Sequence, residues 1–146
     1  MTTWLQQEFD VARESLIEVG ISKKALQRIR VKPFSGRGVG RAYVNTGGNI
    51  IYISSLWIAM VKAFPFLVEA FHGVIRHELG HILIHRYPKI AKEFALGDYP
   101  DLTWWDIVTT TLLEGYQNVC KEEWLCEQIR ERNPEVIKRL VRIIRK

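Results

Sequence analysis

The segment His77-Glu78-Leu79-Gly80-His81 has the residue types and the spacing of a zinc site. Two histidines four residues apart lie on the same face of a helix, about one turn from each other, so both imidazoles can reach a single tetrahedral zinc ion. The glutamate between them then lies beside the water molecule that the metal would activate. The pattern predicts His77 and His81 as zinc ligands and Glu78 as the general base of a hydrolytic reaction.

The residues around this motif predict that its helix is buried. Apolar side chains flank it on almost every side, at Val74, Ile75, Leu79, Ile82, Leu83 and Ile84. Charged and polar groups on a buried helix need partners. A metal ion supplies a partner for the two histidines, whereas the alternative, a helix with two partly buried histidines and a surface glutamate, does not. This comparison favours metal binding.

A catalytic zinc site needs a third protein ligand and one position left open. His85 continues the spacing of four residues, but it would lie about 12 Å from His77 along the helix axis at ~1.5 Å per residue. A zinc–nitrogen bond is only about 2.1 Å long, so one straight helix cannot offer all three histidines to one ion. We therefore expect His85 to pack or to contact a ligand, and the third ligand to come from another element.

The helical pattern of residues 104–132 supplies the acidic candidates for the third ligand, which are Glu114, Glu122, Glu123 and Glu127. Glu123 and Glu127 share one face of that helix, because they are four residues apart. One of them can bind zinc while the other accepts a hydrogen bond from a ligand histidine and fixes its tautomer. We predict Glu123 as the ligand and Glu127 as the acceptor. Glu114, with Asn118 at the same spacing, stays open as the alternative ligand.

The rest of the chain predicts an α+β fold with a small antiparallel or mixed β-sheet. Apolar residues spaced by three and four predict helices, and apolar runs around glycine and asparagine predict strands and a turn. The expected order is a helix over 4–19, a strand over 29–34, a hairpin of 42–44 and 50–53, and helices over 55–60, 66–86, 104–132 and from Pro134 onward. Pro33 indicates that the first strand lies at a sheet edge or ends there.

Composition predicts one globular domain over residues 1–146. The chain is 47% hydrophobic and 25% charged, which excludes a disordered or fibrous protein. The two cysteines, Cys120 and Cys126, are six residues apart, so they indicate neither a CxxC metal pair nor a disulfide framework. The sequence shows no continuous apolar span and no signal peptide at its start, and we expect a cytoplasmic protein.

The C-terminal segment carries the positive charge. Residues 130–146 contain seven basic and two acidic side chains, which accounts for the whole net charge of +5. Apolar residues are interleaved with these basic residues, so 133–146 predicts a short amphipathic helix whose apolar side must dock. If the basic face is functional, a membrane surface or a nucleic acid is the expected partner.

The motif HELGH in a buried helix, followed by a glutamate in an ExxxE setting on a later helix, resembles the gluzincin metallopeptidases. The chain is most similar to the soluble minigluzincins and to the catalytic domains of CAAX prenyl proteases, HtpX-type proteases and beta-lactam sensor peptidases. Residues 51–56 also resemble the strand and connection before the zinc helix of those families, which usually have aspartate where this chain has Glu127. The resemblance implies a zincin-like fold, a Zn²⁺ cofactor and hydrolysis of peptide or protein substrates.

Further expectations follow from the resemblance. An extended substrate pairs with an edge strand in those families, which implies substrate binding by Asn49, Ile51 and Ile53, although both hairpin strands can equally be paired within the sheet. Minigluzincins are latent when a C-terminal segment covers the cleft, which implies an inhibitory role for 133–146. HELGHILIH is also similar to the ImmA/IrrE-type regulatory peptidases. The alternative function is a regulatory or nucleic-acid-associated protein whose zinc site is structural or acts on one partner only.

Overall fold

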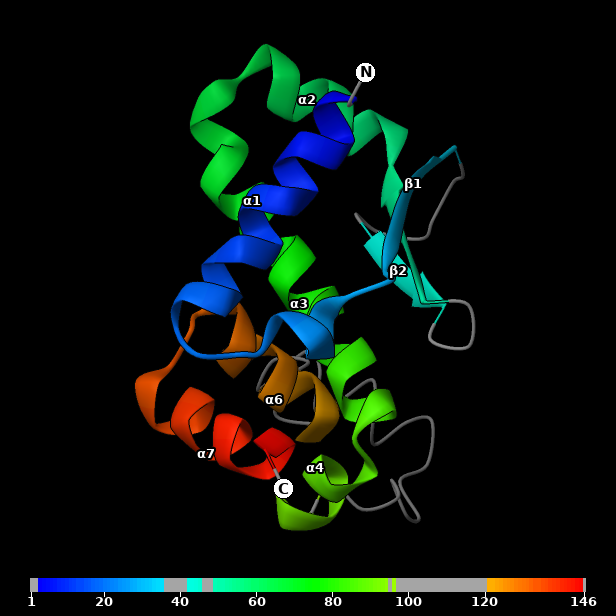
Figure 1. Ribbon diagram of the computed structural model, residues 1–146. Helices are drawn as coiled ribbons and strands as arrows, with labels where there is room; N and C mark the ends of the chain where they lie inside the picture. Colours follow the sequence, from blue (N-terminus) through cyan, green and yellow to red (C-terminus); the bar gives the residue numbers. More distant parts are fainter. Residues whose placement is uncertain (1–2, 36–41, 46–48, 95, 97–120, 146) are drawn as a thin grey trace, which may run out of the picture.

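The computed structural model describes residues 3–35, 42–45, 49–94, 96 and 121–145. In these ranges the chain is an α+β fold, as predicted, with one three-stranded sheet beside a group of helices (Figure 1). The elements, with 3-10 helices marked η, are α1 (Trp4–Glu18), η1 (Lys23–Leu26), β1 (Arg30–Phe34), β2 (Ala42–Asn45), β3 (Ile50–Ser54), α2 (Ser55–Ala63), η2 (Pro65–Leu67), α3 (Val68–Arg86), α4 (Pro88–Glu93), α6 (Lys121–Arg130) and α7 (Pro134–Arg145).

Most of the predicted elements in the described ranges are confirmed by these bounds. The exception is α4, because Pro88 was expected only to end the preceding helix, whereas it also begins a new one. Proline fits the first turn of a helix, where its missing N–H has no partner to lose. Of the helix predicted over 104–132, the described part is α6, and Glu114 and Asn118 lie outside the described residues.

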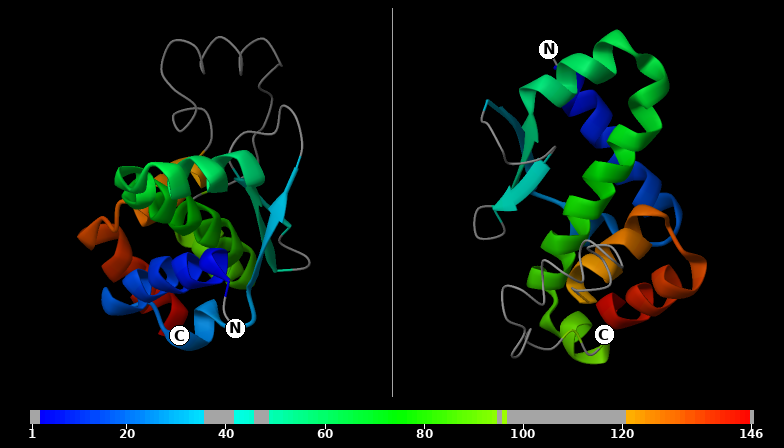
Figure 2. Two further views of the ribbon diagram at one scale, coloured as in Figure 1. Left: turned by 90° about the horizontal axis from the view of Figure 1, so that it is seen from above. Right: turned by 180° about the vertical axis from the view of Figure 1, so that it is seen from behind.

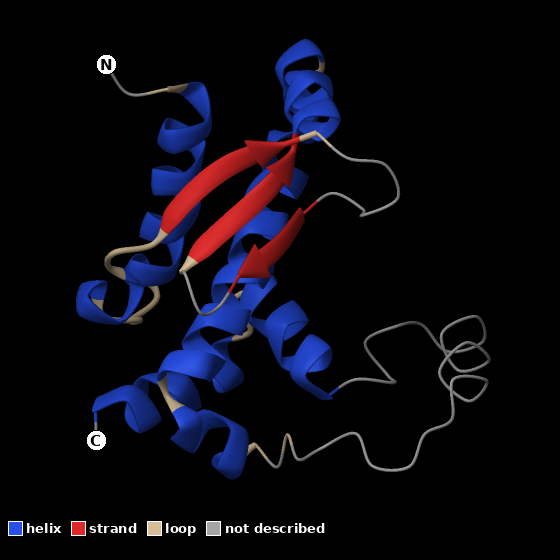
Figure 3. Ribbon diagram, turned by 90° about the vertical axis from the view of Figure 1, so that its right-hand side faces the viewer, coloured by secondary structure: helices blue, strands red, loops and turns tan. Residues whose placement is uncertain are grey.

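The sheet is mixed, with the strand order β1-β3-β2. β2 and β3 form the predicted antiparallel hairpin, in which Tyr43 lies opposite Tyr52 and their ring centres are 4.8 Å apart. β1 runs parallel to β3. Pro33 lies on β1, at the edge of the sheet, as expected for a residue that has no N–H to donate. Figure 3 shows β3 between its two neighbours.

The position of β3 corrects the predicted substrate-binding strand. β3 is the central strand, so its backbone pairs with β1 on one side and with β2 on the other. The carbonyl of Asn49, just before β3, accepts a hydrogen bond from the amide of Arg30 at 2.9 Å, and Ile51 and Ile53 are fully buried. Asn49, Ile51 and Ile53 therefore cannot bind an extended substrate as an edge strand, and that prediction is wrong.

α3 is the buried helix that the sequence predicted. Most of its 19 residues are buried, and it packs against α1, β2, α4 and α6. Its buried polar side chains have partners on other elements: His72 pairs with Glu8 of α1, while Arg76 donates to the carbonyl of Arg130 at 2.8 Å and to the hydroxyl of Ser15 at 3.3 Å. Because these groups are hydrogen-bonded, they are tolerated in the interior and fix α3 between α1 and α6.

The helices α3 and α6 approach each other closely at Gly80. A Cβ atom at this position would lie 3.1 Å from both Cys126 Sγ and Ile129 Cδ1, and 3.3 Å from Cys126 Cα. Such contacts are tighter than ordinary packing, and one of them involves the backbone. Glycine at position 80 and a small side chain at position 126 therefore set the distance between the two helices.

The apolar side of α7 docks on neighbouring helices, as its pattern predicted. Ile137 and Leu140 are buried, and α7 packs against α4 and α6. The Arg139 side chain donates to the carbonyl of Glu93 and lies over the ring of Phe94, 4.3 Å from the ring centre. These contacts dock the apolar side of α7 on the helices around it.

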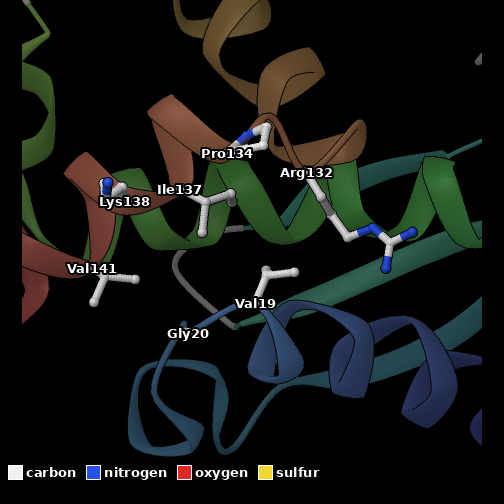
Figure 4. Close-up of a pocket in the computed structure, with 7 residues that line it drawn as sticks. All are labelled: Val19, Gly20, Arg132, Pro134, Ile137, Lys138 and Val141. Carbon is white, nitrogen blue, oxygen red and sulfur yellow. The ribbon is translucent and has the colours of Figure 1, made fainter.

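A pocket of about 420 Å³ lies between the end of α1 and the start of α7 (Figure 4). Val19, Ile137 and Val141 form apolar walls, and Arg132 and Lys138 add two cationic side chains. The described residues that line it include no histidine, carboxylate or nucleophile. This pocket is therefore separate from the predicted zinc site and has no group for acid–base chemistry.

Among the described residues, no single helix is long and apolar enough to cross a membrane. α2 and the segment Pro65–Arg86 reach that length and composition only when they are taken together, and they are bent by 120° at the break between them.

Replacing Leu140 with alanine should test the docking of α7. Leu140 is fully buried, so the change removes apolar contacts and leaves a cavity. We expect the free energy of unfolding in urea to fall by about 2–5 kcal/mol. Arg142→Ala, on the exposed side of the same helix, is the matched control and should change this free energy by less than about 0.5 kcal/mol. Equal effects of the two changes would show that α7 is not packed as described.

Candidate metal centre

Two antiparallel helices bring the histidines and the glutamates together. His77 and His81 lie on α3 with their ring centres 5.2 Å apart, and α6 faces them with Glu122, Glu123 and Glu127. His77 pairs with Glu127, and His81, one turn further along α3, pairs with Glu122, which is earlier on α6. The two helices are therefore antiparallel. Figure 2 shows α6 alongside α3 from two further sides. The side chains of His77 and Glu123 are 14% and 15% exposed, so solvent reaches the cluster.

The carboxylate of Glu123 lies between the two histidines. Its Oε2 is 2.7 Å from His77 Nε2, and its Oε1 is 2.9 Å from His81 Nε2. One ring nitrogen from each histidine therefore points to the same carboxylate. This convergence is what a metal site with two imidazole ligands and one carboxylate ligand requires.

The second ring nitrogen of each histidine also faces a carboxylate. His81 Nδ1 is 2.9 Å from Glu122 Oε2, and His77 Nδ1 is 3.2 Å from Glu127 Oε1. The His77 pair is close but is not aligned as a hydrogen bond, and His77 Nδ1 is a buried atom without a hydrogen-bond partner among the described residues. Ligand histidines commonly donate from this second nitrogen to a carboxylate, so Glu122 and Glu127 are placed to orient the rings.

Arg130 holds Glu127 from the other side. Its Nη1 is 2.7 Å from Glu127 Oε2. The Arg130 side chain runs past Gly73 of α3, where a Cβ atom would lie 3.0 Å from Arg130 Nε. Glu127 is therefore positioned by an ion pair on its own helix that depends on open space on α3.

The cluster has an excess of negative charge. Glu78 and the three glutamates of α6 surround the two imidazoles, and Arg130 contributes one positive charge. A carboxylate only accepts hydrogen bonds, so a ring nitrogen that bonds to one must carry a proton. Both nitrogens of His81 are 2.9 Å from carboxylate oxygens, so without a metal this ring is an imidazolium.

The pKa values follow from these contacts. Burial alone would lower the pKa of His81, but its hydrogen bonds with Cys126, Glu122 and Glu123 outweigh burial and raise that pKa above the ordinary 6.5. Burial alone would raise the pKa of Glu123, but its hydrogen bonds with His77 and His81 lower it to about 2. The pKa of Glu122 is lowered as well, chiefly by its hydrogen bond with His81. The proton that His81 keeps thus supplies positive charge next to the glutamates.

Glu78 is buried next to His77 on α3 and is 9% exposed. Burial raises the pKa of Glu78 above its ordinary 4.5, and the nearby charges of His81 and His77 oppose that rise. A carboxyl group with a raised pKa exchanges a proton near neutral pH more readily than an exposed one does. Glu78 therefore has the environment of a general base.

The donor set fits zinc. Two imidazoles and a carboxylate form a known catalytic ligand set, and a divalent ion would bring positive charge to the glutamates around them. Cys126 is a competitor for the third place, because its Sγ and one ring nitrogen of each histidine all lie within 4.8 Å of one another. We favour Glu123, because its oxygens already contact Nε2 of both rings.

The structure brings together the residues that the sequence predicted for the metal and its chemistry, which are His77, Glu78, His81, Glu123 and Glu127. His85 lies outside this cluster. The side chain of His85 is 54% exposed and lies 3.9 Å from Glu122, so it neither packs in the core nor contacts a histidine ligand.

Glu122 and Cys126 both lie beside His81, and neither contact was predicted from the sequence. The contact of Glu122 follows once α3 and α6 are known to be antiparallel, because a step of four residues forward from His77 on α3 corresponds to a step of four or five backward from Glu127 on α6. The contact of Cys126 follows from the close approach of the two helices at Gly80. Residue spacing on each helix was available, but the relative direction of the helices was not.

Comparisons of the chain with protein-family models, with curated protein sequences and with solved structures found no match. The chemistry of this cluster is therefore the basis for the functional interpretation.

Removal of metal should make the stability of the protein depend on pH through this cluster. The raised pKa of His81 gives stabilisation that is complete below pH 6.5 and is lost as the pH rises through the raised value. The lowered pKa of Glu123 gives stabilisation that is complete above pH 4.5 and is lost as the pH falls toward 2. The chelator-treated protein should therefore show its highest melting temperature between pH 4.5 and 6.5.

The variant His81→Gln is the control for this profile, and its melting temperature should lose most of the decline on the alkaline side. A metal-free wild-type protein whose melting temperature continues to rise above pH 6.5 would contradict a charged His81 in the cluster.

Zinc competition with a chelator should identify the third ligand. Glu127→Ala removes a group that orients a ligand, which costs about 10–100-fold in affinity, and Glu123→Ala should cost more because it removes a ligand. The two variants lose the same charge from the same helix, so the comparison is matched. If Glu114→Ala weakens zinc binding more than Glu123→Ala does, Glu114 is the ligand instead.

Proposed function

We propose that the protein is a zinc-dependent metallopeptidase of the gluzincin type, in which His77, His81 and Glu123 hold the metal. The observation that carries this proposal is the position of Glu123, whose carboxylate oxygens lie 2.7 and 2.9 Å from Nε2 of the two histidines. The buried Glu78 beside them supports a hydrolytic site rather than a storage site. The resemblance of HELGH and the later ExxxE motif to the minigluzincins supports the same class and a zincin-like fold.

A bound zinc ion would supply Lewis acidity, which polarises a scissile carbonyl and lowers the pKa of water. The proton transfers belong to the protein. Glu78 accepts a proton from the attacking water and returns it to the leaving amine, so one carboxylate serves both steps. Burial raises the pKa of Glu78, which suits this exchange near neutral pH. Because water is the nucleophile, no side chain forms a covalent bond with the substrate.

Glu122 and Glu127 hold the imidazole rings in position. Glu122 bonds to Nδ1 of His81, and Glu127 faces Nδ1 of His77. With a metal ion bound, a proton on each Nδ1 would leave the lone pair of each Nε2, the atom that points toward Glu123, free to bind the ion. Arg130 pairs with Glu127 and keeps its carboxylate beside His77.

β2 is the sheet edge best suited to bind an extended peptide. It packs against α3, and among the described strands it pairs only with β3. Backbone groups on an edge strand can hold a peptide through main-chain hydrogen bonds irrespective of its side chains. We therefore assign substrate pairing to Ala42–Asn45, in place of the central strand β3.

The alternative function is a regulatory or nucleic-acid-associated protein. Its support is the exposed basic face of α7, which carries Lys138, Arg139, Arg142 and Arg145. Phosphates of nucleic acids or of anionic lipids are attracted to such a face. This function predicts salt-sensitive binding of DNA or RNA that is independent of Glu78. An inhibitory role of residues 133–146 and a cytoplasmic location stay predictions.

Glu78→Gln should abolish peptide hydrolysis and leave zinc in place. Glutamine has nearly the same shape but cannot accept the proton, so the rate of cleavage of an unstructured fluorogenic peptide should fall about 10²–10⁴-fold. Zinc content, measured by elemental analysis, should stay near one per chain, because Glu78 is not a ligand. Glu69→Gln is the matched control, since Glu69 is an exposed glutamate of the same helix. Cleavage that persists in Glu78→Gln and survives a chelator would exclude the proposed function.

A further inference from the structure

Cys126 lies at the metal cluster without a role in the mechanism above. It is fully buried on α6, three residues after Glu123, so both side chains leave the same face of the helix. Its Sγ and one ring nitrogen each of His77 and His81 lie within 4.8 Å of one another. Ligand atoms of one tetrahedral zinc ion, each about 2.0–2.3 Å from the metal, are separated by about 3–4 Å, so small movements would bring these three atoms to one ion.

Packing explains only part of the position of Cys126. A buried cysteine often behaves as a small apolar side chain, and the contact with Gly80 is of that kind. Polar groups also lie beside it, since the thiol is hydrogen-bonded with His81 and is close to the charges of Glu122 and Glu123. Alanine would be small enough for the contact with Gly80, whereas the thiol adds a soft donor that zinc binds well.

Gly80 of the HELGH motif gives the sulfur access to this position. A Cβ atom at residue 80 would lie 3.1 Å from Cys126 Sγ and would crowd it. The glycine therefore lets a residue of α6 reach between the two histidines of α3. The sulfur and the Glu123 carboxylate approach the histidines from adjacent turns of one helix.

We propose that Cys126 is a fourth protein ligand of the zinc ion in the resting protein. This inference rests on the proposed function, because it takes His77, His81 and Glu123 as the other three ligands. Four protein ligands complete a tetrahedral zinc site and leave no position for water or substrate. The resting site is therefore closed, and peptide hydrolysis requires the thiolate to leave the metal.

Cobalt substitution tests the sulfur ligand. A thiolate bound to cobalt(II) gives an intense charge-transfer absorption in the near ultraviolet, which imidazole and carboxylate ligands do not give. Wild-type protein loaded with one cobalt per chain should show this band. Cys126→Ser and Cys126→Ala should lose the band while they still bind one cobalt per chain through the other three ligands. Cys120→Ser removes the other cysteine of the sequence and should keep the band.

X-ray absorption at the zinc edge of the wild-type protein needs no variant, and it should show one sulfur at about 2.3 Å from the metal. One bound metal without a sulfur signal would overturn the role of Cys126 and leave the proposed function standing, whereas a wild-type protein that binds no metal would overturn both.

At equal metal content, both Cys126 variants should hydrolyse peptide faster than the wild type. Equal rates, with sulfur bound in the wild type, would overturn the closed resting site.

Discussion

The carboxylates of α6 and the imidazoles of α3 face one another across a largely buried contact, and this arrangement requires positive charge between them. Glu123 contacts both rings, and Glu122 and Glu127 face their remaining nitrogens. The raised pKa of His81 keeps one positive charge there in the absence of metal, and a divalent ion would bring two charges to one point. Binding of a cation at this site would consequently be coupled to the packing of α6 onto α3.

The same helix contact serves packing and chemistry. Gly80 lies between His77 and His81 in the sequence, and its missing side chain lets Cys126 and Ile129 approach the axis of α3. On the opposite side, α3 is tied to α1 through His72 and Glu8 and through Arg76 and Ser15. The helix that carries the histidines is thus held from two directions. Core contacts rather than loops therefore fix the cluster, which is the rigidity that a bound metal would need.

The sequence was sufficient where local pattern determines structure. The apolar surroundings of HELGH identified a buried helix, and the spacing of four residues placed His77 and His81 on one face of it. The ExxxE spacing selected Glu123 and Glu127, which both meet His77. The local pattern does not show which distant segments pair with each other. Nothing in the strand over 30–34 indicates that it runs parallel to β3, and this pairing makes β3 central and removes it as a substrate-binding edge.

Gly73 lies one helical turn before His77, so the sequence pattern of the candidate site can be extended by one turn. The Arg130 side chain occupies the space beside Gly73 on its way to Glu127, and a side chain at position 73 would press against it. Glycine four residues before the first histidine and arginine three residues after the second glutamate therefore form a matched pair. A chain with HExxH and ExxxE that has both of these residues should share this helix pair, whereas a chain that has only one of them must orient its first histidine in another way.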